Sequence, residues 1–313
     1  MEDKVIVQAK PLGDFCVRVF EKLDVPAVDA KITADVLVEA DLRGIDSHGV
    51  ARLRRYVKGL QDGVMLAHPE EMTVSETATT ALIDAGAGLG QPVSYRAMKL
   101  SIEKAKKYGT GFVTVRNSNH YGIAGYYAMM ALEYNMIGIS MTNADVLVVP
   151  TFGRHAVLGT NPIAMAVPTG QERPFVLDMA TSTVPRGKLE TYDRQGKAMP
   201  LGWATDEKGI PTADAHRVLD NFRARRGGGL LPLGGAGELF SGHKGYGLAL
   251  LVDILSAVLP GAAYANTVYP KTPQGKPLPA NLGHFFGTIK VEAFRSVDGF
   301  KSSMDDLIRR LKN

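Results

Sequence analysis

The sequence predicts an α/β protein whose chain begins as a helical module. Apolar residues recur at helical spacing between residues 12 and 60, and beyond Pro69 short strand-like segments alternate with helical ones. With 45% hydrophobic and 22% charged residues over 313 positions, the composition is that of an ordinary globular protein. A chain of this length can form two domains or one large domain.

The helical module is predicted from apolar spacing and from one proline. Pro26 separates two stretches with apolar residues three and four positions apart: Phe15, Val19, Phe20 and Leu23, then Ile32, Val36, Leu37 and Ala40. A further helix of this module would carry the polar segment that begins at Asp46.

The segment from Asp46 to Tyr56 gathers more reactive side chains than any other part of the chain. The Ser47 hydroxyl adjoins the His48 imidazole, and Arg52 lies four positions beyond, on the same face if a helix runs from here. An imidazole can transfer a proton beside a guanidinium that binds a carboxylate. The structural alternative is that Ser47 caps a helix, His48 makes a buried hydrogen bond and the arginines form an exposed face.

The next element is a strand over residues 80–84, followed by glycines at 86, 88 and 90 and a helix over residues 93–108. This order invites comparison with a dinucleotide-binding fingerprint. However, Gln91 occupies the place of the third glycine, and no acidic residue follows at the ribose-binding distance. The glycines are better explained by a tight turn between strand and helix.

A second histidine stands where α/β proteins place their ligands. The strand over residues 111–115 leads into a polar stretch, residues 116–122, and then into a helix over residues 124–133. His120, within that stretch, is therefore a second candidate acid or base. The alternative is that Asn119 or His120 only caps the helix.

Further strands are predicted over residues 136–141, 163–167 and 175–178, and the last of these ends on Asp178. A carboxylate at a strand end beside small residues is typical of a ligand site, where it could orient an imidazole or hold a ribose hydroxyl. Its structural alternative is to cap the next helix. The polar stretch over residues 192–212 is expected to leave the core, and residues 223–229 to be mobile.

The C-terminal part combines a candidate phosphate contact with an apolar run. Lys244 stands beside glycines before a helix, although without the spacing of a P-loop. The run over residues 246–259 is too short to cross a bilayer and is expected to be a buried helix. A strand over residues 285–294 and an amphipathic helix over residues 303–311 complete the prediction.

Composition argues against several classes of protein. The net charge of +4 is small, and aromatic residues do not alternate with basic ones, so nucleic-acid binding is not expected. Cys16 is the only cysteine, which excludes a disulfide within one chain, and the N-terminus lacks the apolar core of a signal peptide. We therefore expect a cytoplasmic protein without a membrane span.

Five motifs in this order resemble the malate/L-lactate dehydrogenase family of NAD(P)-dependent 2-oxoacid oxidoreductases, from about Leu12 onward. They are Asp46-Ser47-His48-Gly49-Val50, Asn117-Ser118-Asn119-His120-Tyr121-Gly122, Gly159-Thr160-Asn161-Pro162, Leu177-Asp178-Met179-Ala180-Thr181-Ser182 and Gly242-His243-Lys244-Gly245. The resemblance implies a non-Rossmann, L-sulfolactate-dehydrogenase-like α/β fold. In it, a mixed-sheet NAD(P)-binding domain is joined to a helical domain built from both chain ends.

The resemblance also implies a domain order and an assembly. Residues 1–70 would form the helical N-terminal segment, residues 71–235 the NAD(P)-binding domain, and residues 236–313 a segment that packs back on the helical domain. The family forms homodimers whose site lies between domains and can include residues of the partner. Many relatives continue beyond the helix that here ends at Asn313, with a tail that can touch the cofactor.

Residue roles follow from the same resemblance. His48 and His120 match the two active-site histidines, Ser47 and Asp178 match a proposed hydrogen-bond relay with His48, and Arg52 matches the residue that faces the substrate carboxylate. Contacts with the cofactor, NAD or NADP, are implied for His120, Tyr121, Asn161, Asp178, Met179, Ala180, Lys244 and Gly245.

The expected function is reversible hydride transfer between the nicotinamide and C2 of a small 2-hydroxy or 2-oxo acid. Within the family, the alternatives are a cyclic ketimine reductase or a ureidoglycolate dehydrogenase. A metal-dependent hydrolase built from His48, His120, Asp178 and His243 is disfavoured, because no pair has metal-ligand spacing. A nucleotide-binding module without catalysis would leave the reactive residues without a purpose.

Overall fold

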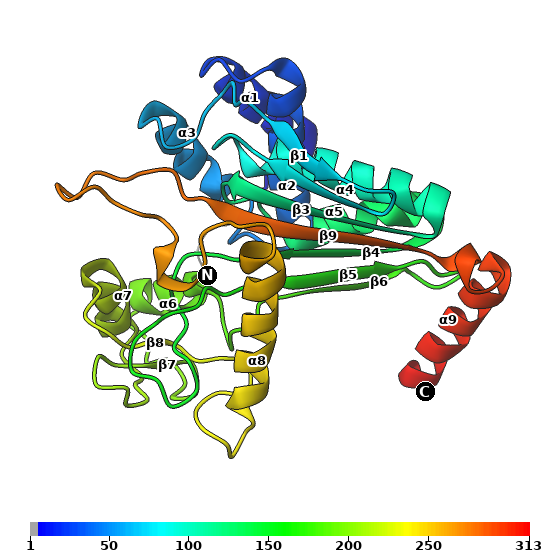
Figure 1. The fold of residues 1–313 in the computed structure, drawn as a ribbon. Coiled ribbons are helices and arrows are strands. Elements are labelled where there is room, and N and C mark those ends of the chain that lie inside the picture. Colours follow the sequence, from blue (N-terminus) through cyan, green and yellow to red (C-terminus); the bar gives the residue numbers. More distant parts are fainter. Residues whose placement is uncertain (1–5) are drawn as a thin grey trace.

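The computed structural model describes residues 6–313 and begins with the expected helical module (Figure 1). Its helices are α1 (Ala9–Glu21), α2 (Ala27–Leu42) and α3 (Leu53–Gln61), with a 3-10 turn η1 (Val50–Arg52) before α3. Pro26 stands immediately before α2 and separates it from α1. The module encloses a small core of Phe20, Val25, Ala30, Leu37, Tyr56, Met65 and Leu89.

Within residues 6–313, seven strands form one mixed sheet, in the order β1-β2-β3-β9-β4-β5-β6. Only β2 and β3 pair in parallel; the other neighbours are antiparallel. The bounds are β1 (Met72–Glu76), β2 (Thr80–Asp84), β3 (Thr110–Ser118), β4 (Met136–Thr142), β5 (Ile163–Val167), β6 (Phe175–Met179) and β9 (Leu282–Lys290). This mixed order confirms that the fold is not a Rossmann fold, in which the strands are mostly parallel.

The strand nearest the C-terminus lies in the middle of the sheet. β9 pairs with β3 on one side and with β4 on the other, so it supplies the hydrogen bonds that these two strands need. The strand of segment 236–313 thus belongs to the sheet rather than to the helical module. The same segment does reach that module through Tyr269, whose hydroxyl lies 2.5 Å from a guanidinium nitrogen of Arg55.

Helices cover one face of the sheet (Figure 1). α4 (Gly90–Tyr108) packs on β3 and β9, and α5 (Ala124–Met129) packs on β4 and β5, followed by η2 (Met130–Tyr134). The core between them is built from buried side chains that include Met98, Ile102, Val113, Tyr127 and Phe286. Because α4 begins at Gly90, the expected helix at residue 93 starts inside the glycine stretch.

A separate lobe, called the lower lobe here, lies below the sheet in Figure 1. It holds α6 (Arg186–Arg194), α7 (Ala215–Ala224), the short antiparallel pair β7 (Ala204–Thr205) and β8 (Gly229–Leu230), and α8 (Gly242–Asp253). Its separate core includes Leu158, Leu189, Leu219, Leu230 and Ala249.

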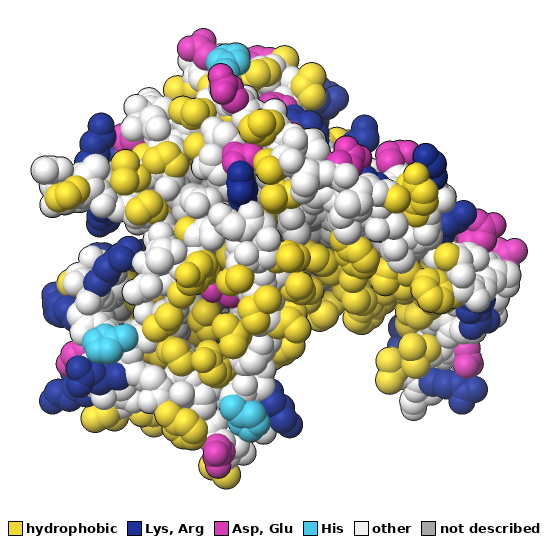
Figure 2. Space-filling view, viewed as in Figure 1, with side chains coloured by type: hydrophobic (Ala, Val, Ile, Leu, Met, Phe, Trp, Pro, Cys, Tyr) yellow, Lys and Arg dark blue, Asp and Glu magenta, His cyan; other side chains and the backbone are white. Residues whose placement is uncertain are grey.

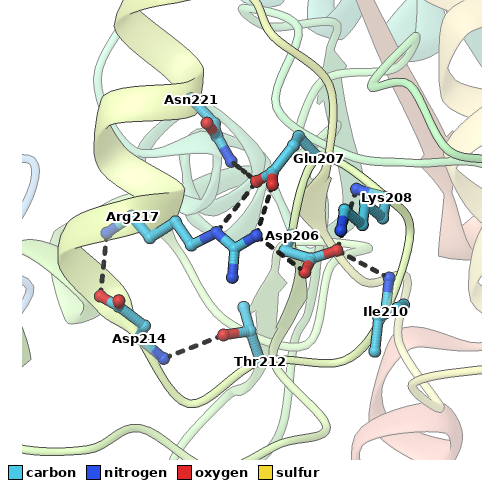
Figure 3. Close-up of polar contacts among 8 residues, drawn as sticks. All are labelled: Asp206, Glu207, Lys208, Ile210, Thr212, Asp214, Arg217 and Asn221. Atoms are coloured by element: carbon cyan, nitrogen blue, oxygen red, sulfur yellow. Dashed lines mark hydrogen bonds and ion pairs between the residues drawn. The ribbon is translucent and has the colours of Figure 1, made fainter.

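The polar stretch over residues 192–212 is fixed to α7 by Arg217 (Figure 3). The guanidinium pairs with Glu207 and lies 3.2 Å from an Asp206 carboxylate oxygen, while Asn221 donates to Glu207 at 3.0 Å. The Asp214 carboxylate accepts the backbone N–H of Arg217 and caps α7. The stretch does leave the central sheet, as expected, and its contacts with α7 hold it in place. The nearby strand β8 is buried.

The apolar run over residues 246–259 is not a buried helix in the single chain. α8 continues as a π-helical segment over Ile254–Val258, which packs against β9 and β3. Only one face of this run is buried, through residues such as Ala249 and Val252. The other face exposes Leu248, Leu250, Leu251, Ile254, Val258 and Leu259. Figure 2 shows hydrophobic side chains gathered here and beneath the sheet. The expectation of a buried helix is therefore wrong, because a run of apolar residues does not reveal what covers it.

The chain ends in α9 (Val297–Lys312), which follows a 3-10 turn η5 (Val291–Ala293) after β9; another short turn, η4 (Ala265–Thr267), lies earlier in the segment before β9. Asp305 of α9 accepts backbone N–H groups of residues 170–172 and so anchors the helix to the loop before β6. Across residues 6–313, no helix is both long and apolar enough to cross a membrane.

Candidate active site

His48 and His120, which are 72 positions apart in sequence, lie against each other in the structure. Their ring centroids are 5.5 Å apart and the planes are inclined by 21°. His48 precedes η1 in the helical module, whereas His120 follows β3 of the sheet. The site therefore lies where the module meets the end of a central strand.

Both rings line a cavity of about 340 Å³ between the helical module and the lower lobe. Its wall comprises Ser47, His48, Arg52, Arg55, His120, Ala144, Asp145, Leu147, Thr160, Pro185, Arg186, Gly187, Glu190 and Tyr269. A larger cavity of about 500 Å³ adjoins it and shares Asp145, Leu147, Arg186 and Tyr269. Nothing in the sequence spacing indicated that Asp145, Arg186 and Tyr269 belong here, because they come from three separate segments. Arg55 stands in the same segment as His48, but no role was assigned to it.

Ser47 and His48 are held by a turn rather than by a helix. The Ser47 hydroxyl oxygen lies 2.9 Å from Nδ1 of His48. The next residue is a glycine because this position has no room for a side chain. A Cβ at Gly49 would lie 1.7 Å from a carboxylate oxygen of Asp41. That carboxylate accepts the backbone N–H of Val50 at 2.9 Å and fixes the start of η1. Since the helix begins after His48, the expected shared helix face of His48 and Arg52 does not exist, although both side chains line the cavity.

His120 is oriented by two hydrogen bonds to the same ring nitrogen. The hydroxyl of the fully buried Tyr56 lies 2.7 Å from Nδ1, and the backbone N–H of Gly122 points to Nδ1 from 3.3 Å. A backbone N–H can only donate, so Nδ1 is the bare nitrogen, Tyr56 also donates to it, and the neutral ring carries its proton on Nε2. Tyr56 closes the sequence motif of His48, but no sequence signal tied it to His120.

The glycine stretch before α4 supports the loop that holds His120. The Asn119 side chain is buried and donates to the carbonyl oxygens of Ala87 and Gly88, at 3.0 and 2.9 Å. A Cβ at Gly90 would lie 2.2 Å from the carbonyl oxygen of Asn119. The glycines therefore allow two backbones to approach closely, and neither Asn119 nor His120 caps α5, whose N-cap is Ile123.

Both imidazoles are neutral at pH 7. Burial and the nearby guanidinium groups of Arg52 and Arg55 lower the pKa of His48 to about 4. Burial and the Arg55 charge also lower the pKa of His120 well below its ordinary value. A neutral imidazole can accept a proton from an alcohol. In this protonation state the two histidines can therefore assist the oxidation of a hydroxyl group.

Asp178 does not reach the histidines within the described chain. It is the penultimate residue of β6, and its carboxylate accepts the backbone N–H of Gly125 at 2.8 Å. Partial desolvation raises the pKa of this carboxyl group above its ordinary value. The structure thus contains the Ser47–His48 contact of the expected relay but places Asp178 at the start of α5.

The other residues expected to contact the cofactor fall into two groups. Asn161 lies behind the cavity wall at Thr160, where the Thr181 hydroxyl bonds to the carbonyl oxygens of Thr160 and Asn161, and Asn161 donates to the Ala249 carbonyl at 2.9 Å. Gly245 packs against the backbone of Leu233. Met179 and Ala180 lead into this region, and Lys244 lies exposed in the first turn of α8. The Tyr121 side chain, in contrast, is buried in the core, stacked on His284 with 4.6 Å between ring centroids.

Over residues 6–313, no group of three histidine, cysteine, aspartate or glutamate side chains is placed to hold a metal ion. His243 lies exposed at the start of α8, in a different element from both cavity histidines.

Comparison with known proteins gives consistent results. A family model described as malate/L-lactate dehydrogenase matches residues 7–313. The chain is 52% identical to a malate dehydrogenase of Pyrococcus abyssi over 312 residues, which is 100% of this chain and 83% of the relative. It is 42% identical to an L-sulfolactate dehydrogenase of Methanocaldococcus jannaschii, covering 94% of this chain and 80% of that protein.

Solved structures agree with the sequence comparison. The structure of malate dehydrogenase from Pyrococcus horikoshii matches with a TM-score of 0.88 at 48% identity, over 99% of this chain and 83% of that one. Sulfolactate dehydrogenase from Methanocaldococcus jannaschii matches with a TM-score of 0.86 at 40% identity, over 99% and 85%.

Proposed function

Because this chain belongs to the malate/L-lactate dehydrogenase family of hydroxy-acid dehydrogenases, we propose that its histidine cavity is where hydride passes between a nicotinamide and C2 of the substrate. The observation that carries the proposal is the meeting of His48, His120 and Arg52 in one cavity. Oxidation of a 2-hydroxy acid requires a group that exchanges a proton with the hydroxyl and a group that binds the carboxylate. The two imidazoles and the guanidinium supply them.

The residues behind the cavity fit a nicotinamide dinucleotide. The region of Thr160, Asn161 and Thr181 adjoins the backbone of Leu233, whose N–H donates to the Thr181 carbonyl, and a Cβ at Gly245 would lie 2.2 Å from the Leu233 carbonyl oxygen. α8 begins here, and the exposed ammonium group of Lys244 in its first turn suits a diphosphate. When bound, the cofactor supplies or accepts the hydride.

The hydrogen bonds of the two histidines would give them different roles, hydrogen-bond donation for His120 and proton transfer for His48. With Nδ1 of His120 accepting from Tyr56 and Gly122, Nε2–H is the group that can donate to the oxygen on C2. Ser47 fixes the ring of His48 at Nδ1 and leaves its Nε2 to take the hydroxyl proton during oxidation or return it during reduction. Asp178 has no part in this step, because its carboxylate is bonded at the start of α5.

Arg52 would bind the carboxylate on C1. Its Nε donates to the Ser47 carbonyl oxygen at 2.5 Å, which ties the guanidinium to the same turn as His48. The planar fork of arginine can then hold a carboxylate by two parallel bonds and fix C2 next to the imidazoles.

We also propose that the protein is a homodimer that covers its apolar surfaces. Ile139, Met165 and Leu177 lie side by side on three neighbouring strands, on the sheet face away from α4 and α5, and are only partly buried. The exposed leucines of α8 add to this surface (Figure 2). Contiguous apolar surface of this kind is typical of a protein–protein interface.

A panel of substrates with both cofactors tests the proposed function. NADH and NADPH would each be mixed with pyruvate, 2-oxobutyrate, oxaloacetate and a cyclic 2-carboxy imine, and loss of the reduced nicotinamide would be followed by absorbance. We expect reduction of at least one 2-oxoacid. Reduction of the imine alone, or of no compound with either cofactor, would contradict the proposal. The preferred cofactor, NAD or NADP, follows from the same measurement.

A further inference from the structure

Arg55 places a second guanidinium in the wall of the cavity that holds Arg52. The two arginines lie three positions apart, at the end of η1 and in the first turn of α3, so they are neighbours along one side of the helix. Both are half-buried, and both line the 340 Å³ cavity with His48 and His120. Arg54, between them, is exposed and does not line this cavity.

The cavity carries more positive than negative charge. Within residues 6–313, neither Arg52 nor Arg55 has an acidic side chain at ion-pair distance: Arg52 bonds to the Ser47 carbonyl, and Arg55 bonds to the Tyr269 hydroxyl at 2.5 Å. A third arginine in the wall, Arg186, is already paired with Glu190 at 2.9 Å. Two positive charges therefore face the cavity without a direct counter-ion.

One acidic side chain in the wall acts on Arg55 from a distance. Asp145 lines the cavity, and its charge helps to raise the pKa of Arg55, but it lies outside ion-pair distance and accepts the backbone N–H of Val146 at 2.9 Å. Withdrawing a charge from water without a partner costs free energy, so a site with two unpaired guanidinium groups favours an anion with two charges.

We infer that Arg55 is the residue by which the site selects a 2-hydroxy or 2-oxo acid with a second acidic group, a dianion, over a monoanion of the same length. This inference rests on the proposed function, which assigns the C1 carboxylate to Arg52. With that carboxylate on Arg52, the second carboxylate or sulfonate lies one helical turn away, on Arg55. A monoanion of the same length leaves the Arg55 guanidinium without a partner, and its binding is weaker for that reason.

The test compares two substrates of equal chain length that differ in the second charge. Oxaloacetate and 2-oxobutyrate would be reduced by the wild type, Arg55→Gln, Arg55→Lys and the control Arg54→Gln, and kcat/KM would be measured for each. Arg54→Gln removes the same charge from an exposed neighbouring position. Circular dichroism and the binding of reduced cofactor, followed by fluorescence, check that each variant is folded.

In the wild type we expect kcat/KM for oxaloacetate to exceed that for 2-oxobutyrate by about 30-fold or more. Arg55→Gln should lower this ratio by about 10-fold or more. Loss of the Arg55 charge also acts on the pKa of the histidines, but that effect is common to both acids and does not change their ratio. Arg54→Gln should leave the ratio unchanged. Arg55→Lys should keep part of the preference, because it keeps the charge but not the fork.

Two results would overturn the inference while leaving the proposed function intact. One is a wild type that reduces both acids equally well. The other is an Arg55→Gln variant, folded and binding cofactor, that loses activity equally on both acids, which would mean that Arg55 supports the histidines or Tyr269 instead. Absence of any activity in the wild type would contradict the proposed function itself.

Discussion

At the residue scale, the site depends on imidazoles kept neutral by burial and by neighbouring guanidinium groups. The pKa of His48 is lowered to about 4, so between pH 6.5 and pH 4 the folded protein holds this ring uncharged while an exposed imidazole would gain a proton. Replacing Arg52 by Met removes one of the charges that lower this pKa. We expect the titration of His48, followed by NMR of its ring, to move to higher pH in Arg52→Met.

The sign of that shift separates the effect of charge from that of burial. Burial still lowers the pKa of His48 in the variant, so the midpoint should stay below the ordinary value of about 6.5. A midpoint that does not move when Arg52 is replaced would show that burial alone sets the protonation of His48.

Tyr56 gives a second prediction at this scale. Tyr56→Phe keeps the ring that packs against Phe20 but removes the hydroxyl that donates to Nδ1 of His120. Since one hydrogen bond to a buried group contributes about 1 to 2 kcal/mol, we expect kcat to fall by about 10-fold with little change in KM. Nitrogen NMR of the ring should also show a weaker preference for the Nε2–H tautomer. Unchanged kcat and an unchanged tautomer would mean that the backbone N–H of Gly122 suffices.

The site residues were predictable only where one motif contains them. Ser47, His48 and Arg52 stand in one short segment, and His120 follows a strand, so residue type and spacing identified them. Arg55 and Tyr269 come together only through the tertiary fold. For Asp178 the local pattern was misleading. Its place near a strand end suggested that it could orient an imidazole, but in the structure its carboxylate accepts the backbone N–H of Gly125.

At the element scale, the glycine stretch before α4 positions the loop of His120. Gly90→Ala would place a Cβ 2.2 Å from the Asn119 carbonyl oxygen, and backbone on both sides would have to move. We expect a loss of about 2 kcal/mol or more in the free energy of unfolding and a fall in kcat, because Asn119 and His120 share this loop.

The matched control for this prediction is Gly247→Ala in α8. No atom lies within 4 Å of a Cβ built at Gly247, and alanine favours a helix over glycine by about 1 kcal/mol. Denaturant unfolding of the two variants should therefore give changes of opposite sign. Equal stability of Gly90→Ala and the wild type would show that the loop can shift without cost.

Strands and helices were largely predictable because their apolar periodicity is local. β2 and β5 match the predicted ranges, and β4 and β6 differ by one residue at an end. The exposed face of α8 was not predictable, because an apolar run looks the same whether its own chain or another chain covers it. The central place of β9 was also hidden, since sheet order depends on contacts between distant segments.

At the scale of the whole molecule, the apolar surface of α8 and the sheet predicts an assembly. Leu251, on the exposed face of α8, is 43% exposed in the single chain. Leu251→Lys should shift sedimentation from a dimer toward a monomer without changing the circular dichroism spectrum, because burying a lysine charge in an interface is unfavourable. Leu201→Lys, at a 60% exposed position in the lower lobe, is the control. A dimer that withstands Leu251→Lys would place the interface elsewhere.

Turnover of a 2-oxoacid by a variant in which both His48 and His120 are replaced by alanine is the decisive measurement of whether this histidine pair performs the proton chemistry. The variant should still bind the reduced cofactor, while its kcat falls by at least about 10²-fold, since the hydride can still be positioned but the proton cannot be supplied. Turnover at the rate of the wild type would contradict the assignment of the chemistry to this pair of histidines.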